Sequence, residues 1–256
     1  MTVSTKPFTV HLQWWAVPFI AVAAHKGGCG KTSITVHLAG AAARVGKRVL
    51  VVDVDPQGAA GAALGVTATK PTLYEVLVGT AKPSEAVRAT VTERLSVLPA
   101  DMDLAGAEVE LPRAAGWQAT LRARLGSLRG FDVCLIDTAP GLGVLPYVAL
   151  AGADRAIIVC TPDYLSYRSL PSVLEATGRA RVKVIGIVPN RVEHRTRHEA
   201  EVLDELRSHY GQLVLGEVPS RVVIRDAGIA GQPLSSYAPQ SDAAAAFDRL
   251  AKEVLA

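Results

Sequence analysis

The sequence lacks the features that mark membrane-spanning, disordered and disulfide-rich proteins. Its longest apolar run, Trp14 to Ala24, has eleven residues, whereas a spanning helix needs about 20. Hydrophobic residues make up 49% and charged residues 20% of the 256 positions, which excludes a disordered chain and allows a sizeable core. The three cysteines, Cys29, Cys134 and Cys160, are odd in number and widely spaced. A disulfide framework is therefore excluded, and a reducing cytosol is expected.

The N-terminus has the composition of a secretory signal, with one lysine, an apolar stretch and small residues at 21–23. That stretch leads directly into a glycine- and lysine-rich loop, so cleavage would remove the strand from which the loop extends. We therefore expect residues 1–15 to form an arm that precedes a single domain of residues 16–256. Trp14 and Trp15 either cap the core of this domain or offer a contact surface.

Short apolar runs alternate with segments of helix length along the rest of the chain. Near-continuous apolar runs are typical of parallel strands buried on both faces. The alternation predicts an α/β fold, with a doubly wound, mostly parallel sheet and helices on both faces. Between residues 65 and 112 we expect short helices packed on one side. The predicted strands are residues 17–24, 48–52, 95–98, 132–136, 155–160, 182–188 and 213–218, and the predicted helices are residues 31–45, 113–128, 163–178, 196–209 and 240–255.

A glycine-rich turn, Lys26-Gly-Gly-Cys-Gly-Lys31-Thr32, lies between the first predicted strand and the first predicted helix. Its glycines let backbone N–H groups surround phosphate oxygens, and the helix N-terminus adds a favourable dipole. Lys31 places a charge at the β and γ phosphates, and Thr32 offers a hydroxyl to Mg²⁺. His25 stands where the standard phosphate-loop pattern has its first glycine. The predicted nucleotide-binding residues of this turn are Gly27, Gly28, Cys29, Gly30, Lys31, Thr32 and Ser33.

Two acidic segments follow predicted strands. Asp53 and Asp55, in VLVVDVDPQG, are two positions apart and share one face of an extended strand end. Asp137, in FDVCLIDTAPG, ends another buried strand in the manner of a Walker B aspartate before a switch loop. Ligands of open α/β sheets bind at these carboxyl ends, and clustered carboxylates are costly without a cation. The sequence therefore predicts a magnesium-nucleotide site there.

These motifs resemble the ParA/MinD family of deviant-Walker P-loop ATPases, and within it the ParA (Soj-like) partition proteins. The resemblance covers about residues 17–256. It is carried by KGGCGKT with its first lysine, by DVDPQG, and by the tail GQPLSSYAPQSDAAAAFDRLAKEVL. The chain departs from the family at residues 59–61, where Ala-Ala-Gly replaces the usual Asn-Ala-Thr, and at Cys29. This cysteine is either a small filler of the loop or an oxidisable thiol.

The resemblance implies a role for each motif residue. Lys26 would be the signature lysine, which reaches across a homodimer to the partner's ATP, and Lys31 would bind phosphate. Asp55 would orient the attacking water. Asn190, in GIVPNRV, is similar to the asparagine that contacts adenine, although a capping role is the alternative. The implied catalytic residues are thus Lys26, Lys31 and Asp55, and the implied metal-binding residues are Thr32, Asp53 and Asp137.

Positive charge is concentrated in residues 179–197, which hold six Arg and Lys against the single acid Glu193, a net charge of +5 compared with +3 for the whole chain. Such a stripe suits contact with phosphate backbones, and no recognition helix for base readout is evident. A solvated face is the alternative. The resemblance implies non-specific binding of double-stranded DNA by ATP-bound dimers through arginines in this part of the chain. The candidate DNA-binding residues are Arg195, Arg197, Arg221 and Arg225.

The predicted function is that of an ATP-dependent DNA-partitioning ATPase in the cytoplasm, associated with the nucleoid. ATP would drive a sandwich homodimer that binds DNA, and hydrolysis stimulated by a ParB-like partner would release it. One alternative places a protein assembly as cargo on the nucleoid. A MinD-like membrane ATPase would need a basic amphipathic C-terminal helix, and the end of this chain is nearly neutral. A metabolic P-loop enzyme or a nitrogenase-type iron protein is a further alternative. The latter would need paired cysteines, whereas Cys134 and Cys160 fit strand packing better.

Overall fold

The computed structural model describes residues 17–256. The predicted arm of residues 1–15, with Trp14 and Trp15, lies outside the described residues. Eight strands form one sheet in the order β3-β4-β2-β5-β1-β6-β7-β8, and every neighbouring pair is parallel except β3 with β4. This confirms the predicted mostly parallel sheet. The strands are β1 (Phe19–Ala23), β2 (Val49–Val54), β3 (Arg88–Ala89), β4 (Leu95–Leu98), β5 (Val133–Thr138), β6 (Arg155–Cys160), β7 (Lys183–Val192) and β8 (Val218–Pro219).

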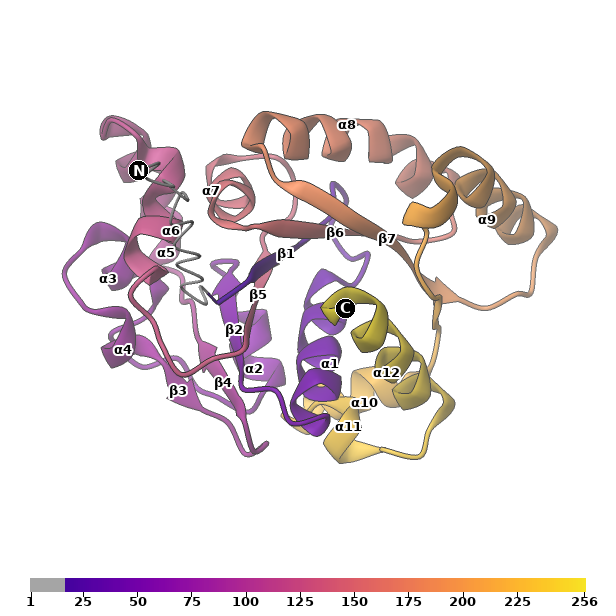
Figure 1. The fold of residues 1–256 in the computed structure, drawn as a ribbon, viewed down its shortest axis with the longest axis horizontal. Coiled ribbons are helices and arrows are strands. Elements are labelled where there is room, and N and C mark those ends of the chain that lie inside the picture. Colours follow the sequence, from indigo (N-terminus) through magenta and orange to yellow (C-terminus); the bar gives the residue numbers. More distant parts are fainter. Residues whose placement is uncertain (1–16) are drawn as a thin grey trace, which may run out of the picture.

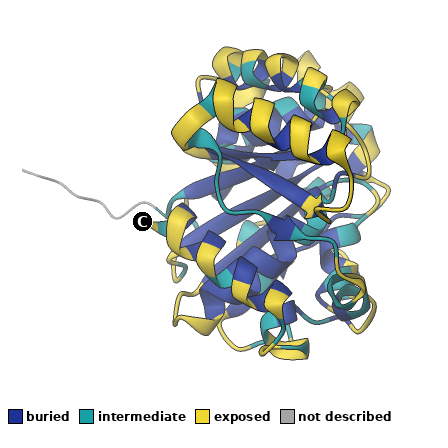
Figure 2. Cartoon of the chain, turned by 90° about the vertical axis from the view of Figure 1, so that its right-hand side faces the viewer, coloured by how far each residue is buried: buried dark blue, intermediate teal, exposed yellow. Residues whose placement is uncertain are grey.

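Helices cover both faces of the sheet, as predicted (Figure 1). Alternate residues of β1 supply two separate cores, Phe19 and Ala21 toward one face and Ile20 and Val22 toward the other. The central strands β1, β2 and β5 are buried along their whole length, whereas the helices expose their outer sides (Figure 2). The first face carries α3 (Leu73–Val78), α4 (Pro83–Ala86), α5 (Leu104–Glu110), α6 (Thr120–Leu125), α7 (Val144–Gly152), α8 (Tyr164–Ala180) and α9 (Arg197–Tyr210), and the second carries α1 (Lys31–Arg44), α2 (Ala59–Ala63), α10 (Val222–Ile229), α11 (Leu234–Tyr237) and α12 (Asp242–Leu255).

Two predicted elements are wrong. The predicted helix 113–128 is broken into the 3₁₀ turns Leu111–Arg113 and Trp117–Ala119 and the short helix α6, because Gly116 adopts a positive φ of 72° between them. The predicted strand 213–218 contributes only its last residue to β8, and Val214 makes an isolated bridge to Ile187. The helix α7 was not predicted, because its apolar sequence has no polar face to reveal a helical period.

Helix α1 is buried on nearly all sides, and His37 joins it to two of the C-terminal helices. The Nδ1 atom of His37 accepts a hydrogen bond from the backbone N–H of Leu234 at 3.0 Å, and its Nε2–H donates to the carbonyl of Ile224 at 3.1 Å. Burial lowers the pKa of His37 to about 4, so the neutral ring fills this place. The first helix after the phosphate loop is thereby fixed to α10 and α11.

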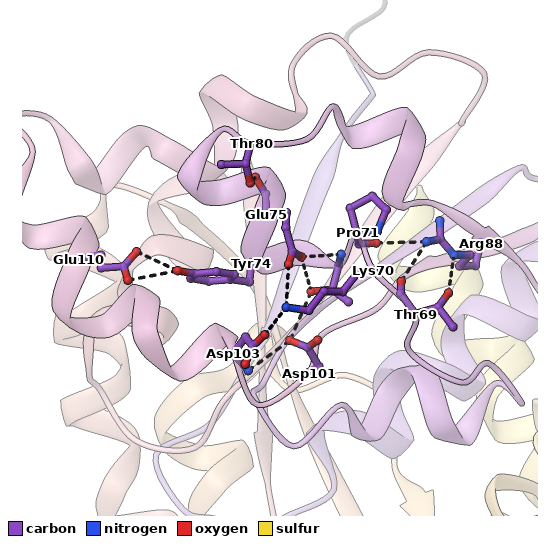
Figure 3. Close-up of polar contacts among 11 residues, drawn as sticks. Thr69, Lys70, Pro71, Tyr74, Glu75, Thr80, Arg88, Asp101, Asp103 and Glu110 are labelled. Carbon is purple, nitrogen blue, oxygen red and sulfur yellow. Dashed lines mark hydrogen bonds and ion pairs between the residues drawn. The ribbon is translucent and has the colours of Figure 1, made fainter.

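The region between residues 65 and 112 does form short helices on one side, as predicted, and polar side chains hold them together (Figure 3). Lys70 lies between the carboxylates of Glu75, 3.3 Å away, and Asp103. The guanidinium of Arg88 donates to the carbonyl of Thr69 at 2.9 Å. Helices of four to seven residues are too short to be stable alone, so this network and the core beneath it fix their positions.

Adding one methyl group at Gly40 should destabilise the fold. A Cβ at this position of α1 would lie 2.3 Å from Cβ of Pro233, so Gly40→Ala is expected to lower the free energy of unfolding by about 1–3 kcal/mol through overpacking. The control is Gly178→Ala in α8, where a Cβ would meet nothing within 4 Å and should stabilise the helix by about 0.5–1 kcal/mol. Urea unfolding measures both, and equal effects would contradict the close packing of α1 against Pro233.

Candidate active site

The glycine-rich turn forms a loop between β1 and α1, as its position in the sequence predicted. Gly28 and Gly30 adopt positive φ angles of 75° and 96°, which other residues reach only with strain. Gly30 is the N-cap of α1 and offers no side chain to cap it, so the backbone N–H groups of the first turn are left for a ligand. Helix N-termini in such loops bind phosphate groups.

Asn190, at the carboxyl end of β7, supports this loop from the interior. Its Nδ2–H donates to the carbonyl of Cys29 at 2.7 Å, and the side chain is 4% exposed. A Cβ on Gly30 would lie 2.3 Å from the same nitrogen. The amide of Asn190 therefore acts in this structure as a brace beneath the phosphate loop, and the residue also lines the adjoining cavity in which a base could lie.

Lys31 and Thr32 begin α1 beside the end of β5. Lys31 is 7% exposed, and the hydroxyl of Thr32 donates to Oδ2 of Asp137 at 2.7 Å. The Thr35 hydroxyl lies 3.1 Å from Oδ1 of the same carboxylate. Asp137 thus holds the first turn of α1 through both of its oxygens, and the predicted Walker B aspartate and phosphate loop lie together.

Asp53 lies directly opposite Asp137, because the two residues are register partners on β2 and β5. Both are fully buried. One oxygen of Asp53 accepts hydrogen bonds from the backbone N–H groups of Ala60 at 2.9 Å and Gly61 at 3.1 Å, and the other accepts from the N–H of Asp55 at 3.2 Å. Asp53 therefore caps the N-terminus of α2, a contact that the sequence analysis did not predict.

The pKa values of both buried carboxyls are raised. Burial is the main cause for Asp53, and the negative charge of Asp137 adds to it. Burial also raises the pKa of Asp137, although the hydroxyls of Thr32 and Thr35 and the charge of Lys31 oppose the rise. Two neighbouring carboxyls in such a setting favour a proton or a cation between them.

The donors at this point fit Mg²⁺. They are a threonine hydroxyl and carboxylate oxygens, which are the hard oxygen ligands that magnesium prefers. Because the predicted metal-binding residues Thr32, Asp53 and Asp137 are brought together beside the phosphate loop, the site could hold a magnesium nucleotide. Asp55 lies at its edge, half-buried, with one oxygen accepting the N–H of Gln57 at 3.0 Å.

Lys26 lies at the surface, whereas Lys31, the other lysine of the loop, is buried. Its Nζ lies 3.6 Å from Oδ1 of Asp163, and the two side chains are 48% and 39% exposed. Asp163 is the N-cap of α8, where it accepts the N–H of Ser166 at 2.9 Å. The first lysine of the loop thus faces solvent within the single chain, where a second molecule could reach it.

Two cavities adjoin the phosphate loop. A cavity of about 530 Å³ lies in front of residues 26–29 and is bounded by residues 161–163 and the turn after β7. A groove of about 920 Å³ runs from Thr32 and Ser33 past Asn190 to α2 and α10. Arg191 borders both. The sequence analysis missed Arg191 as a lining residue, although its position next to Asn190 could have indicated it.

The four arginines predicted to bind DNA fall in two places. Arg195 and Arg197 lie before and at the start of α9, with side chains 79% and 93% exposed, and they pair with nearby acids. Arg221 and Arg225 line the groove beside the phosphate loop. Arg221 pairs with Asp242 at 2.7 Å, whereas Arg225 has no ion pair among residues 17–256. Arg195 also lines the cavity in front of residues 26–29, so the structure puts three of these four arginines beside the candidate nucleotide site.

The cysteines are all buried and unpaired. Burial raises the pKa of Cys29 and Cys134, and raises that of Cys160 to about 11, which keeps the thiols protonated and unreactive. Cys29 therefore fits the first of its two predicted roles, that of a small filler of the loop.

Comparison with known proteins identifies several relatives. Residues 17–185 match the family described as an AAA domain, and residues 141–256 match the family of 4Fe-4S iron sulfur cluster binding proteins of the NifH/frxC type. The chain is similar to the chromosome-partitioning ATPase Soj of Thermus thermophilus, with 37% identity over 93% of this chain and 95% of the relative. It is also similar to the sporulation initiation inhibitor protein Soj of Bacillus subtilis, with 33% identity over 93% of this chain and 98% of the relative.

Solved structures with the same fold include apo McdA of Cyanothece, with a TM-score of 0.85 and 24% identity, which covers 94% of this chain and 100% of that one. The septum site-determining protein MinD of Pyrococcus horikoshii, complexed with Mg-ADP, has a TM-score of 0.79 and 29% identity and covers 93% and 96% of the two chains. No helix within residues 17–256 has the length and apolar character needed to cross a membrane.

Replacing Asp53 by asparagine should change how stability depends on pH. The metal-free folded chain holds a proton at the raised Asp53 and Asp137 carboxyls more tightly than the unfolded chain, whose aspartates titrate near pH 4. The free energy of unfolding should therefore fall as pH rises from about 4 through neutrality. Asp53→Asn removes one charge and keeps an oxygen for the α2 cap, so its stability should fall less over this range.

Urea unfolding without magnesium, at about pH 5 and about pH 8, measures this difference. The free energy of unfolding of Asp53→Asn, relative to that of the wild type, is expected to be most favourable at the higher pH. An equal loss of stability at both pH values would mean that Asp53 contributes through its hydrogen bonds alone.

Proposed function

The chain belongs to the Soj and ParA family of chromosome-partitioning ATPases, and on that basis we propose that it is a Mg²⁺-dependent ATPase whose ATP-bound homodimer binds DNA non-specifically. Hydrolysis of ATP then releases the DNA. The observation that carries the proposal is the phosphate loop with two lysines, one buried and one exposed. Lys31 is 7% exposed beside Asp137, whereas Lys26 extends from the surface.

The nucleotide is bound by groups that already converge. The N–H groups of residues 27–33 and the charge of Lys31 receive the phosphates, and Asn190 borders the cavity for the base. Thr32, with Asp137 and Asp53 beside it, would hold Mg²⁺, which would supply positive charge to the phosphates. Asp55 orients the attacking water: its oxygen that does not bond Gln57 has no hydrogen-bond partner among residues 17–256.

Lys26 is free to leave its place in the single chain. An exposed ion pair such as that between Lys26 and Asp163 contributes only about 0.2–1 kcal/mol, and the single carboxylate of Asp163 carries one negative charge where a triphosphate carries several. A second protomer's nucleotide therefore offers Lys26 a better partner than Asp163 does. ATP that binds the dimer more tightly than the monomer shifts the population toward dimers.

The basic residues of the second half of the chain give this dimer its DNA affinity. Arg195, Arg197 and Arg225 are exposed, and pairing two protomers doubles the number of arginines that can release counterions from one duplex. Arg191 and Arg195 border the cavity in front of the phosphate loop, but no arginine among residues 17–256 makes a hydrogen bond or ion pair to the loop, so turnover should be slow until a ParB-like partner stimulates it. We place the protein on the nucleoid for these reasons.

The proposal favours DNA over a membrane as the surface that the dimer binds. A membrane-bound relative would need a free amphipathic helix, and the apolar face of α12, with Ala244, Phe247 and Leu250, is buried in the core that it shares with α1. A protein assembly carried on DNA remains compatible with the same chemistry, since only the stimulating partner differs.

Lys26→Ala should abolish ATP-dependent dimerisation without unfolding the chain, because the only described contact of this side chain is one exposed ion pair. Size-exclusion chromatography with light scattering, with ATP and Mg²⁺, should show dimers of the wild type and monomers of the variant. Lys252→Ala, an exposed lysine on α12, is the matched control and should dimerise. A Lys26→Ala variant that still forms dimers would contradict the contact across the interface.

DNA binding should depend on the nucleotide. Fluorescence anisotropy at fixed salt should show tighter binding of a duplex with ATP than with ADP.

Asp55→Ala should keep the DNA-bound state while turnover falls at least about a hundredfold. Arg225→Ala should weaken binding to all sequences alike and reduce the salt slope by about one, whereas Arg113→Ala on the opposite face should not. Equal affinity with ATP and ADP would refute the proposed function.

A further inference from the structure

The end of β7 and the loop that follows it, residues 190–195, form a turn whose backbone conformation its residues do not favour. Arg191, at an irregularity in the pairing of β7 with β8, and His194 have positive φ angles of 62° and 55°, in the left-handed region that residues with a side chain rarely adopt. Strain of this kind persists only where the surroundings determine the conformation, and it clusters at functional sites. Two of the four such non-glycine residues in 17–256 lie within this one turn.

Surrounding residues hold the turn in place. The buried carboxylate of Glu199 accepts the backbone N–H of Glu193 at 2.6 Å and of Arg195 at 3.2 Å. Asn190 is fixed to the phosphate loop through the carbonyl of Cys29, and Nε2 of His194 lies 2.8 Å from a carboxylate oxygen of Glu217. The turn is therefore anchored on both sides of Arg191.

The anchored turn determines where the side chain of Arg191 lies. It forms the boundary between the cavity in front of the phosphate loop and the groove that contains Ser33 and Asn190. It has no hydrogen bond or ion pair to any residue between 17 and 256. Its charge lies near the loop, because it opposes the rise that burial causes in the pKa of Cys29.

Pro219 and Ser220, at the end of β8, line the same groove. They lie beside the end of β7, because Pro219 is the register partner of Val192 and the N–H of Ser220 donates to the carbonyl of Val192 at 2.9 Å. A purine that enters the groove with its phosphates at Ser33 therefore passes the paired ends of these two strands, where Arg191 lies. The planar, weakly hydrated guanidinium group stacks well on aromatic faces. The guanidinium of Arg191, which the turn holds at this point, is therefore available to stack on the flat face of a bound base.

We propose that Arg191 stacks on the base of the bound nucleotide and so determines affinity for the base rather than for the phosphates. This inference rests on the proposed function, because it takes the bound ligand to be ATP. This role accounts for the left-handed conformation of Arg191, because that conformation directs the side chain across the groove instead of along β7.

The test uses Arg191→Gly, which removes the side chain and suits the positive φ of 62°. The variant should therefore fold at least as well as the wild type. Its affinity for ATP and for ADP, measured by titration calorimetry with Mg²⁺, should fall by the same factor of about ten. Its affinity for tripolyphosphate, which has no base, should not change.

The matched control is Arg181→Gly. Arg181 has a φ of 57° at the end of α8, is exposed and borders neither cavity. The control removes the same charge and relieves the same strain, and it should bind all three ligands as the wild type does. Unchanged ATP affinity in Arg191→Gly, or an equal loss for tripolyphosphate, would overturn the stacking contact. A wild-type chain that binds neither ATP nor ADP would instead refute the proposed function.

Discussion

The pairing of two buried carboxylates on neighbouring strands is the constraint on which the rest of the site depends. Asp53 and Asp137 face each other across β2 and β5 with no exposure to solvent, an arrangement whose desolvation must be offset by hydrogen bonds or by a cation. Asp137 accepts a hydrogen bond from the hydroxyl of Thr32, and Asp53 accepts hydrogen bonds from the N–H groups that begin α2. The pair thus fixes both the helix that follows the phosphate loop and the short helix that follows Asp55.

This link explains how the departure from the family at residues 59–61 is accommodated. The contact from Asp53 uses the backbone N–H groups of Ala60 and Gly61, which any residue other than proline supplies. The small side chains let α2 approach α10 closely, with Ala63 3.8 Å from the position that a Cβ of Gly228 would take. A change in charge at Asp53 can therefore shift α2, and α2 can in turn shift α10 that packs against it. This coupling needs no polar side chain at position 59.

The parts of the site that could be predicted from the sequence are those set by local geometry. Loop, strand end and helix start are contiguous in the chain, so the roles of Lys31 and Thr32 and the meeting of Asp53 with Asp137 follow from strand order. Contacts made across the fold could not be predicted. The brace from Asn190 to the loop joins positions 161 residues apart. Arg191 depends on a left-handed turn that arginine does not favour and that distant side chains impose. The same limit applies to residues 113–128, where the composition of a helix gives no sign of the break at Gly116.

The division of the basic residues bears on how nucleotide and DNA binding are coupled under the proposed function. Arg197 lies at the start of α9 and borders neither cavity, so its charge is available whatever they contain, whereas Arg195 borders the cavity in front of residues 26–29. Arg221 and Arg225 line the groove itself, where the phosphates of a nucleotide carry the same charge as those of DNA. Arg221 is already paired with Asp242, which leaves Arg225 to respond. A ligand in the groove must then attract Arg225 or move it, so the nucleotide-dependent share of DNA affinity belongs to α10 and the constant share to Arg197 at the start of α9.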